Sequence, residues 1–209
     1  MIHVRVALVK NIKSATERKK MKIILGSQSA GRKKVLQEMG YEFEVMPPNI
    51  DEKAIRFDDP VKLTSELAKA KAEALKHRII EPAILVTSDQ VVVYGGKIRE
   101  KPVNAEEAQE FLQSYNSGPA ETVTSIMVMN TDNGKQAIGT DVAKINFVPF
   151  SEEDIKNLIE RGDLFNYAGG FSTYGEIWAD HVKDIEGEME SIIGLPKTLT
   201  QKLIEEVSS

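Results

Sequence analysis

The sequence predicts an α/β fold in which helices flank a mixed, twisted β-sheet. Short apolar runs rich in β-branched residues alternate along the chain with segments of helical periodicity. Two longer strand-like segments, 122–130 and 136–147, flank a turn that contains Asn133-Gly134, a strong hairpin signal. Alternating strands and helices indicate parallel pairing, whereas a hairpin pairs antiparallel, so we expect both in one sheet.

The first half of the chain carries a signal for each expected element. An apolar strand leads into a helix that stops at Gly40. Pro60 then opens an alanine-rich helix, and Gly95-Gly96 marks a hairpin turn. The expected strands lie at 23–25, 43–46, 84–87 and 91–94.

The second half of the chain carries capping signals at the expected helix ends. Asn104 is expected to cap a helix at 105–115, which has two acidic residues in its first turn. Ser151 with Asp154 resembles a capping box, and Gly162 is expected to stop the helix that follows. Pro196 begins a final helix at 197–207.

Composition excludes several classes of protein. A formal net charge of −5 argues against nucleic-acid polymers and membranes as partners, although a local basic pocket for a polyanion stays open. No apolar run is long enough to span a bilayer. The chain has no cysteine and only three widely spaced histidines, which excludes a thiolate metal site and suits a reducing compartment.

Residues 1–20 differ from the rest of the chain. An apolar run at 4–9 is followed by Lys13, Arg18, Lys19 and Lys20, with one acid, Glu17. An organelle-targeting peptide is a weak alternative, because the segment has two Ser/Thr and no clear cleavage site. We expect an extension at 1–20 that is disordered or pairs with a sheet edge, and one domain at 21–209.

The most informative segment is 23–34, which reads IILGSQSAGRKK. A strand that enters a helix through Gly and Ser directs backbone N–H groups and the positive end of the helix dipole at one place. With Arg32 and two lysines beside it, this place is a candidate phosphate site. A simpler interpretation is a helix cap at Ser27 or Ser29 beside a solvated basic face.

A P-loop is excluded at this segment. Gly26 and Gly31 have the spacing of G-x-x-x-x-G-K-[ST], but Arg32 replaces the required lysine and Lys33 replaces the hydroxyl that would bind Mg²⁺.

Four other segments could carry chemistry. Asp51-Glu52 lies in a proline-led loop, and Lys71 lies on a helix face of small residues. Asp89 lies between two apolar strands, where an unpaired carboxylate is costly. Lys101 precedes Pro102, which would fix the chain there. For Asp51-Glu52 the simpler interpretation is an exposed acidic turn, and for Lys71 and Lys101 it is a surface lysine.

Taken together, these residues have a chemical logic. Arg32, Lys33, Lys71 and Lys101 could bind several phosphates, while Glu52 and Asp89 could hold a hard divalent cation through oxygen. A metal-activated water that attacks a phosphoryl centre needs those parts and no covalent nucleophile. Nucleotide pyrophosphate hydrolysis therefore fits better than acyl transfer, because no Ser-His-Asp set is apparent.

From about residue 22 to the end, the chain resembles the Maf family of nucleoside triphosphate pyrophosphatases. The order and spacing of the motifs carry the resemblance, since each motif alone is weak. They are S-x-S-P-x-R at 27–32, where Ala30 replaces the usual proline, the acidic pair at 51–52, L-A-x-x-K-A at 67–72, [AS]-D-[TQ]-V at 88–91, K-P at 101–102, A-G-x-[FY] at 168–171 and G-L-P at 194–196.

The resemblance implies a function and a fold. Such enzymes cleave a nucleoside triphosphate between the α and β phosphates and require Mg²⁺ or Mn²⁺. Asp89 matches the proton acceptor, and Glu52 a metal-related acid. Ser27, Arg32, Lys71 and Lys101 match the phosphate-binding positions, and Ser29 is a further candidate for substrate binding. The family fold has two lobes around a deep nucleotide-binding cleft. Members are usually cytoplasmic and often dimeric, so the resemblance implies a cytoplasmic protein and leaves a homodimer open.

Three positions bear on the base. Relatives that cleave dTTP and UTP usually have Arg, Thr and Gln at the positions of Gly31, Gln90 and Tyr174, and relatives that cleave 7-methyl-GTP tend towards Trp, Gln and Glu. Of these three residues only Gln90 matches one of the groups, and it favours the group that cleaves 7-methyl-GTP. The base preference therefore stays open.

Two other functions stay open beside a pyrophosphatase that removes non-standard nucleotides. One is a nucleotide-binding regulator of cell division with little turnover, and the other is a phosphatase that releases single phosphates. The presence of Glu52, Asp89, Lys71 and Lys101 favours the enzyme, because a binding protein would tolerate their loss.

Overall fold

The computed structural model describes residues 21–172, 178 and 180–209. The first half contains β1 (Lys22–Leu25), α1 (Ala30–Glu38), β2 (Phe43–Val45), the 3-10 helix η1 (Glu52–Ala54), α2 (Pro60–Lys76), β3 (Ala83–Tyr94), β4 (Lys97–Arg99) and α3 (Ala105–Ser114). The second half contains η2 (Tyr115–Ser117), β5 (Ala120–Asn130), β6 (Gln136–Phe147), α4 (Glu152–Arg161), η3 (Asp163–Asn166), η4 (Ala168–Gly170), β7 (Val182–Glu186), α6 (Met189–Ile193) and α7 (Lys197–Ser208).

The sheet is mixed, as the sequence predicts. Within the described residues seven strands form one sheet in the order β2-β1-β3-β5-β6-β7, and β4 pairs with β3. β1 runs parallel to β2 and β3, and the remaining pairs are antiparallel. The predicted hairpin joins β5 to β6.

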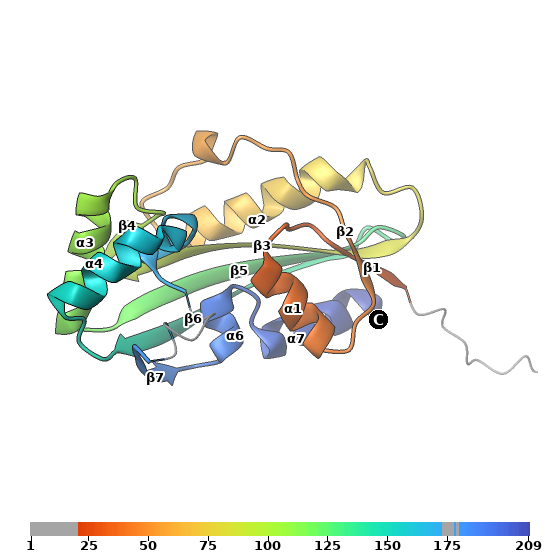
Figure 1. Cartoon of the computed structure of the whole chain (residues 1–209). Coiled ribbons are helices and arrows are strands. Elements are labelled where there is room, and N and C mark those ends of the chain that lie inside the picture. Colours follow the sequence, from red (N-terminus) through yellow and green to blue (C-terminus); the bar gives the residue numbers. More distant parts are fainter. Residues whose placement is uncertain (1–20, 173–177, 179) are drawn as a thin grey trace, which may run out of the picture.

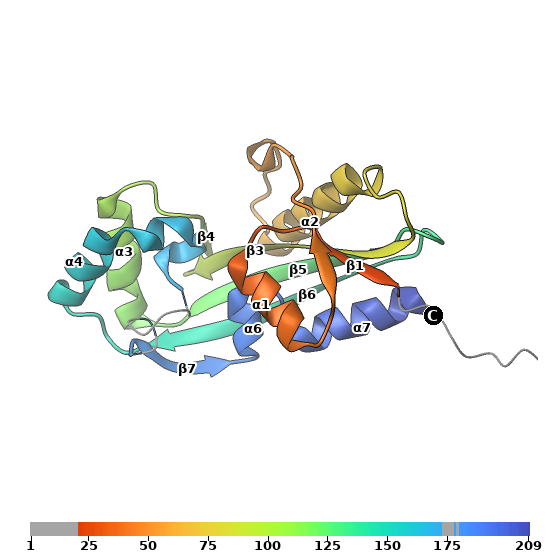
Figure 2. The ribbon, with the colours of Figure 1, turned by 45° about the vertical axis from the view of Figure 1, so that its right-hand side comes forward.

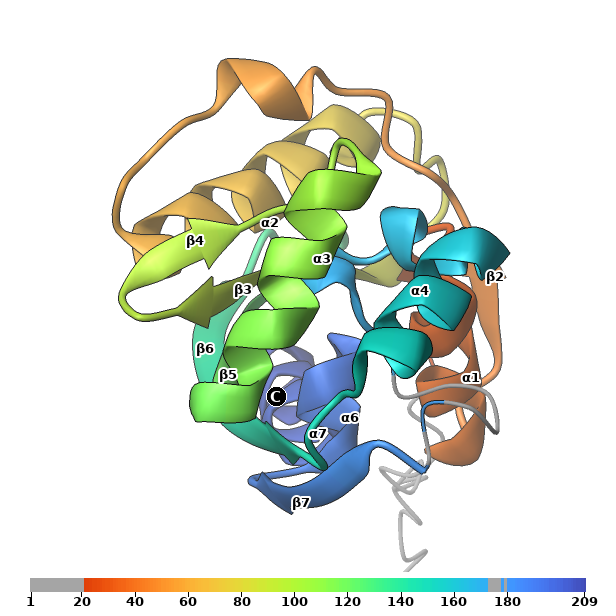
Figure 3. The same cartoon turned by 60° about the vertical axis from the view of Figure 1, so that its left-hand side comes forward.

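Helices cover both faces and one end of the sheet (Figure 1). Seen from the side, α2 lies on one face, and α1 and α7 lie on the other. Leu75 and Ala72 of α2 pack on β3 with Leu85, while Leu203 of α7 packs against Val128. The helices α3 and α4 pack together at the opposite end from α7, around a separate aromatic core (Figures 2 and 3).

The caps explain why the sequence located most helix ends. The Asn104 side chain accepts a hydrogen bond from the amide of Glu107 at 2.8 Å, and Ser151 and Asp154 form the predicted capping box. Gly162 ends α4 with φ 75°, a left-handed conformation that glycine adopts without strain.

One prediction in this region is wrong. Residues 84–87 and 91–94 are not two strands but parts of β3, a single strand of 12 residues. The polar residues between them remain in the strand because β5 pairs with β3 through the whole segment, with Ser88 opposite Ile126 and Asp89 opposite Ser125. The sequence also gave no signal for β7, whose residues are mostly exposed, or for the five-residue helix α6.

Candidate phosphate site at a gap in the sheet

The predicted site residues meet where β3 lacks a neighbour on one side. β1 pairs with β3 up to Leu25 and Val86, and β4 pairs with β3 from Val92 onwards. Between these ladders, residues 87–91 have β5 on one side and no described strand on the other. The carboxyl end of β1 borders this gap, and open α/β sheets commonly bind ligands at the carboxyl ends of their strands.

Gly26 allows the chain to leave the sheet at this point. Its amide donates to the Val86 carbonyl at 2.8 Å, which closes the β1–β3 ladder. A Cβ atom at Gly26 would lie 2.6 Å from Thr87 Cγ2 and 2.8 Å from Leu75 Cδ1. Only glycine therefore fits this turn without displacing the side chains of Thr87 and Leu75.

The loop after Gly26 directs Arg32 into the gap. Ser27 is buried and its Oγ accepts a hydrogen bond from the Ser29 amide at 3.2 Å. Ser29 is the N-cap of α1, with its Oγ accepting from the Arg32 amide at 3.4 Å. The Arg32 side chain turns inward, and its Nη1 donates to the Ser88 carbonyl at 3.0 Å. The capping interpretation thus holds for Ser29, but Arg32 is not part of a solvated face.

On the α2 face of the sheet, three charged groups form a chain. Lys71 is 6% exposed and Asp89 is 7% exposed, and Lys71 Nζ lies 2.6 Å from Asp89 Oδ1. The same Nζ lies 3.3 Å from Oε1 of Glu52, which is half-exposed in η1. The single positive charge of Lys71 is shared between two carboxylates, and its close contact with Asp89 offsets part of the cost of burying that group.

Burial is the largest influence on the pKa values of Asp89 and Arg32. It raises the pKa of Asp89 above its usual range, although Lys71 and Arg32 oppose the shift. Burial also lowers the pKa of the Arg32 guanidinium, which the charges of Asp89 and Glu52 partly offset. A carboxyl group whose pKa is raised in this way is suited to accept a proton near neutral pH.

The opposite face of the gap carries neutral polar groups. Gln90 Nε2 donates to the Ser191 carbonyl of α6 at 2.7 Å, to the Ile192 carbonyl at 3.2 Å and to Thr124 Oγ1 at 3.0 Å. Arg32 Nε lies buried beside this cluster, and within the described residues it has no hydrogen-bond partner. An orphaned buried donor is costly, so a bound acceptor here would be stabilised.

The remaining predicted residues are Gly31, Lys101 and Tyr174. Gly31 lies in the first turn of α1. Lys101 is exposed after β4, and within the described residues it makes no ion pair with Glu52 or Asp89. Tyr174 lies outside the described residues. Conversely, sequence reasoning did not foresee the Ser191 and Ile192 carbonyls, because backbone acceptors leave no trace in residue type.

The carboxylates fit a hard divalent cation only together with a substrate. Among the described residues, no group of three or more His, Cys, Asp or Glu side chains could hold a metal ion. Two carboxylates completed by phosphate oxygens are a common way to bind Mg²⁺. Lys71 contacts one oxygen of Glu52 and one of Asp89, so a cation would share these carboxylates with the ammonium group.

The fold and the site define an α/β protein in which Lys71, Arg32 and two carboxylates gather at the carboxyl end of a parallel strand. The chain belongs to the Maf-like protein family, whose model matches residues 22–207. A 7-methyl-GTP pyrophosphatase of Dictyostelium discoideum is 49% identical over 193 residues, which cover 89% of this chain and 97% of the relative.

Two more distant relatives share the same coverage of this chain. A nucleoside triphosphate pyrophosphatase of Synechococcus sp. is 34% identical over 88% of this chain and 93% of its own. A dTTP/UTP pyrophosphatase of Clostridium perfringens is 31% identical over 88% of this chain and 96% of its own. Within the described residues, no helix has the length and apolar character needed to cross a membrane.

Proposed function

We propose that the protein is a nucleoside triphosphate pyrophosphatase that converts modified or non-standard nucleotides to nucleoside monophosphate and pyrophosphate. The observation that carries the proposal is the buried ion pair between Lys71 and Asp89. Lys71 also contacts Glu52, and Arg32 reaches the same gap in the sheet from α1. The pyrophosphatase relatives support the reaction class.

The cations would bind the triphosphate from two sides. Lys71 lies on the α2 face and Arg32 reaches the gap from α1, and both contact the Ser88 carbonyl. A phosphate chain placed at this carbonyl would meet a lysine on one side and a guanidinium on the other. Two fixed cations stabilise the charge that develops on phosphate oxygens during cleavage. Lys101 would reach the phosphates from the exposed end of β4.

Asp89 would act as the proton acceptor. It would take the proton of a water whose oxygen bonds to the α phosphorus, while the bond from that phosphorus to the bridging oxygen breaks and the bridging oxygen leaves with pyrophosphate. Mg²⁺ or Mn²⁺, held by Glu52, Asp89 and the phosphates, would supply charge stabilisation and lower the pKa of water. Lys71 keeps the Asp89 carboxylate in place through its 2.6 Å contact.

For the base, we infer a preference for 7-methyl-GTP over dTTP and UTP. Two observations support it: the relative at 49% identity carries the name 7-methyl-GTP pyrophosphatase, and Gln90 is the residue typical of that group. Gln90 Nε2 is engaged by α6, which leaves its Oε1 as the acceptor for a base N–H. Family resemblance further supports a cytoplasmic homodimer.

The test is product analysis on a nucleotide panel with Mg²⁺ or Mn²⁺. Pyrophosphate and a nucleoside monophosphate are expected, fastest from 7-methyl-GTP. Release of single phosphates would indicate a phosphatase instead. Tight nucleotide binding without turnover, with either metal, would favour the regulator of cell division.

A further inference from the structure

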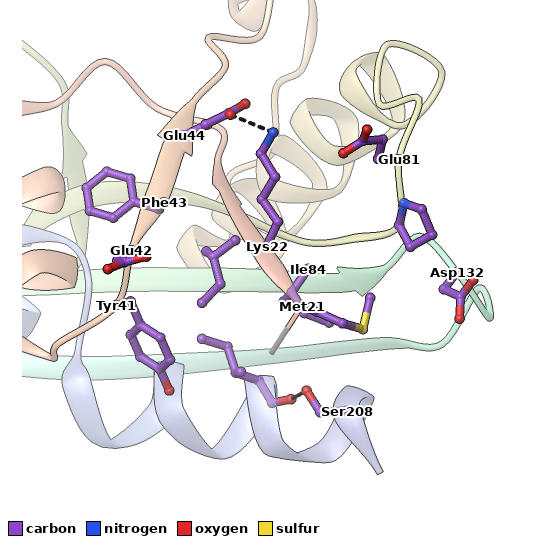
Figure 4. A pocket seen from close by; sticks show the side chains of 13 residues that line it. Met21, Lys22, Tyr41, Glu42, Phe43, Glu44, Glu81, Ile84, Asp132 and Ser208 are labelled. Atoms are coloured by element: carbon purple, nitrogen blue, oxygen red, sulfur yellow. Dashed lines mark hydrogen bonds and ion pairs between the residues drawn. The ribbon is translucent and has the colours of Figure 1, made fainter. Parts of the chain in front are cut away.

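A cavity of about 1170 Å³ lies at the amino ends of the parallel strands, away from the site. We call it the amino-end cavity. Its floor is apolar and comes from four elements of the chain: Met21 before β1, Tyr41 and Phe43 around the start of β2, Ile84 of β3 and Ile204 of α7. Figure 4 shows Tyr41 directed toward α7. Met21, Tyr41 and Phe43 are only partly buried, whereas Ile84 and Ile204 belong to the buried core beneath them.

Acidic side chains surround this apolar floor. Glu81 and Asp132 lie at one end of the cavity and Glu42 lies toward the other (Figure 4). Among the described residues none of these three carboxylates makes an ion pair, whereas Glu44 is paired with Lys22 at 2.5 Å. The cavity thus combines an apolar floor with three uncompensated negative charges.

The segment that immediately precedes the cavity has the complementary chemistry. Residues 1–20 contain six lysine or arginine residues and one glutamate, and they include the apolar run Val4-Arg5-Val6-Ala7-Leu8-Val9. The described chain begins at Met21, which itself lines the cavity. The basic segment is therefore attached at the rim of an acidic, apolar cavity.

We propose that residues 1–20 dock in the amino-end cavity, with apolar residues of 4–9 on its floor and basic residues against Glu42, Glu81 and Asp132. The intervening eleven residues span up to about 36–40 Å when extended, so the apolar run can reach any part of the cavity. A short tether gives an effective concentration on the order of millimolar, so a weak intrinsic affinity is enough.

The docking can be measured in the full chain. Because the sequence has no cysteine, Ala7→Cys provides a unique site for a nitroxide spin label. Amide signals of Tyr41, Phe43, Ile84 and Ile204 are expected to lose at least about half of their intensity through paramagnetic relaxation. Raising the salt concentration to about 1 M, where the Debye length is about 3 Å, should restore much of the signal.

A charge-reversed variant and a matched control test the assignment. Glu42→Lys/Glu81→Lys/Asp132→Lys should abolish the signal loss. Glu106→Lys/Glu110→Lys/Glu153→Lys makes the same change of charge at exposed positions on α3 and α4, at the other end of the molecule, and should preserve it. If the first variant does not fold, the salt series on the parent chain decides the question.

Three outcomes would overturn the proposal. The first is an absence of signal loss around the cavity, and the second is signal loss that persists in the charge-reversed variant and in salt. The third is signal loss in isotope-enriched chains without a spin label when they are mixed with spin-labelled chains. The occupant of the cavity would then be the segment of a second copy.

Discussion

The two faces of β3 carry different kinds of polar group at the gap in the sheet. On the α2 face, Asp89 forms a buried ion pair with Lys71 that extends to Glu52. On the α6 face, Gln90 is held by backbone carbonyls and by Thr124. Alternation along a single strand produces this separation, since neighbouring side chains point to opposite faces.

The difference suggests a division of labour within a few residues. Charged groups in a low-dielectric environment interact strongly with phosphates and with protons. Neutral amides and carbonyls have directional hydrogen bonds that distinguish one base from another. Changes to the charged groups, Lys71 and Asp89 on the α2 face and Arg32 from α1, should therefore lower the rate for every nucleotide. Changes to the neutral groups on the α6 face should alter the ranking of nucleotides.

The largest effect is expected for Asp89→Asn on the α2 face. The variant keeps the shape of the side chain but cannot accept a proton, so turnover should fall by about 10²-fold or more for all substrates. Lys71 then loses its buried anion, so a thermal melt must accompany the kinetics. A folded Asp89→Asn protein with near-normal turnover would remove Asp89 from the mechanism.

The second comparison sets Arg32→Ala against Lys34→Ala. Both residues are cations on α1, but Arg32 reaches the Ser88 carbonyl, whereas Lys34 is exposed and lies 4.0 Å from Glu38. Arg32→Ala should reduce kcat/KM by about 10²-fold with every base, because it removes a cation fixed at the phosphates. Lys34→Ala should change it by less than about twofold. An Arg32→Ala effect confined to one base would place Arg32 with the base instead.

The pH profile tests the environment of Asp89. Burial raises its pKa, so the acid limb of kcat/KM should lie above the range of an ordinary carboxyl group. Activity requires the carboxylate, and it is therefore lost as pH falls through this raised pKa. Glu52 contributes to the upward shift through its negative charge, so Glu52→Gln should move the acid limb to lower pH, alongside any loss of rate. A limb that does not move would mean that another group titrates.

Selectivity on the α6 face can be altered separately. Gln90→Leu removes the acceptor that we assign to the base, while the charged groups on the α2 face remain in place. The ratio of kcat/KM for 7-methyl-GTP to that for UTP should fall by about tenfold, or about 1.4 kcal/mol. Tyr174→Ala is a companion variant, since the sequence predicts that Tyr174 stacks on the base. An equal loss on both nucleotides would mean that these residues support the fold rather than read the base.

Much of this arrangement could be predicted because it depends on residues that are close together in the sequence. Helix ends followed from caps such as Asn104 and Gly162, and Asp89 was identified as an acid between apolar runs. The gap in the sheet could not be predicted, because it depends on β1 and β4 pairing with different halves of β3. The role of α6 was also invisible, because a five-residue helix has too short a pattern and contributes carbonyls rather than side chains.

The smallest expected effect concerns Gly194, which lies beside both Arg32 and Gln90. Gly194 ends α6 with φ 94°, and a Cβ atom there would lie 3.1 Å from Arg32 Nη2 and 3.2 Å from Gln90 Oε1. Gly194→Ala should therefore shift both side chains by a few tenths of an ångström. We expect kcat/KM to fall by about three- to tenfold, since small displacements of a positioned group lower the rate.

Gly162→Ala supplies the matched control for this last variant. Gly162 also has a left-handed conformation, with φ 75°, but no heavy atom lies within 4 Å of its Cβ position. Both substitutions carry a similar cost in backbone strain, on the order of 1 kcal/mol, so both should lower the melting temperature to a similar extent. Only Gly194→Ala should also lower kcat/KM. Equal kinetics in the two variants would show that α6 stabilises the fold without positioning Arg32 and Gln90.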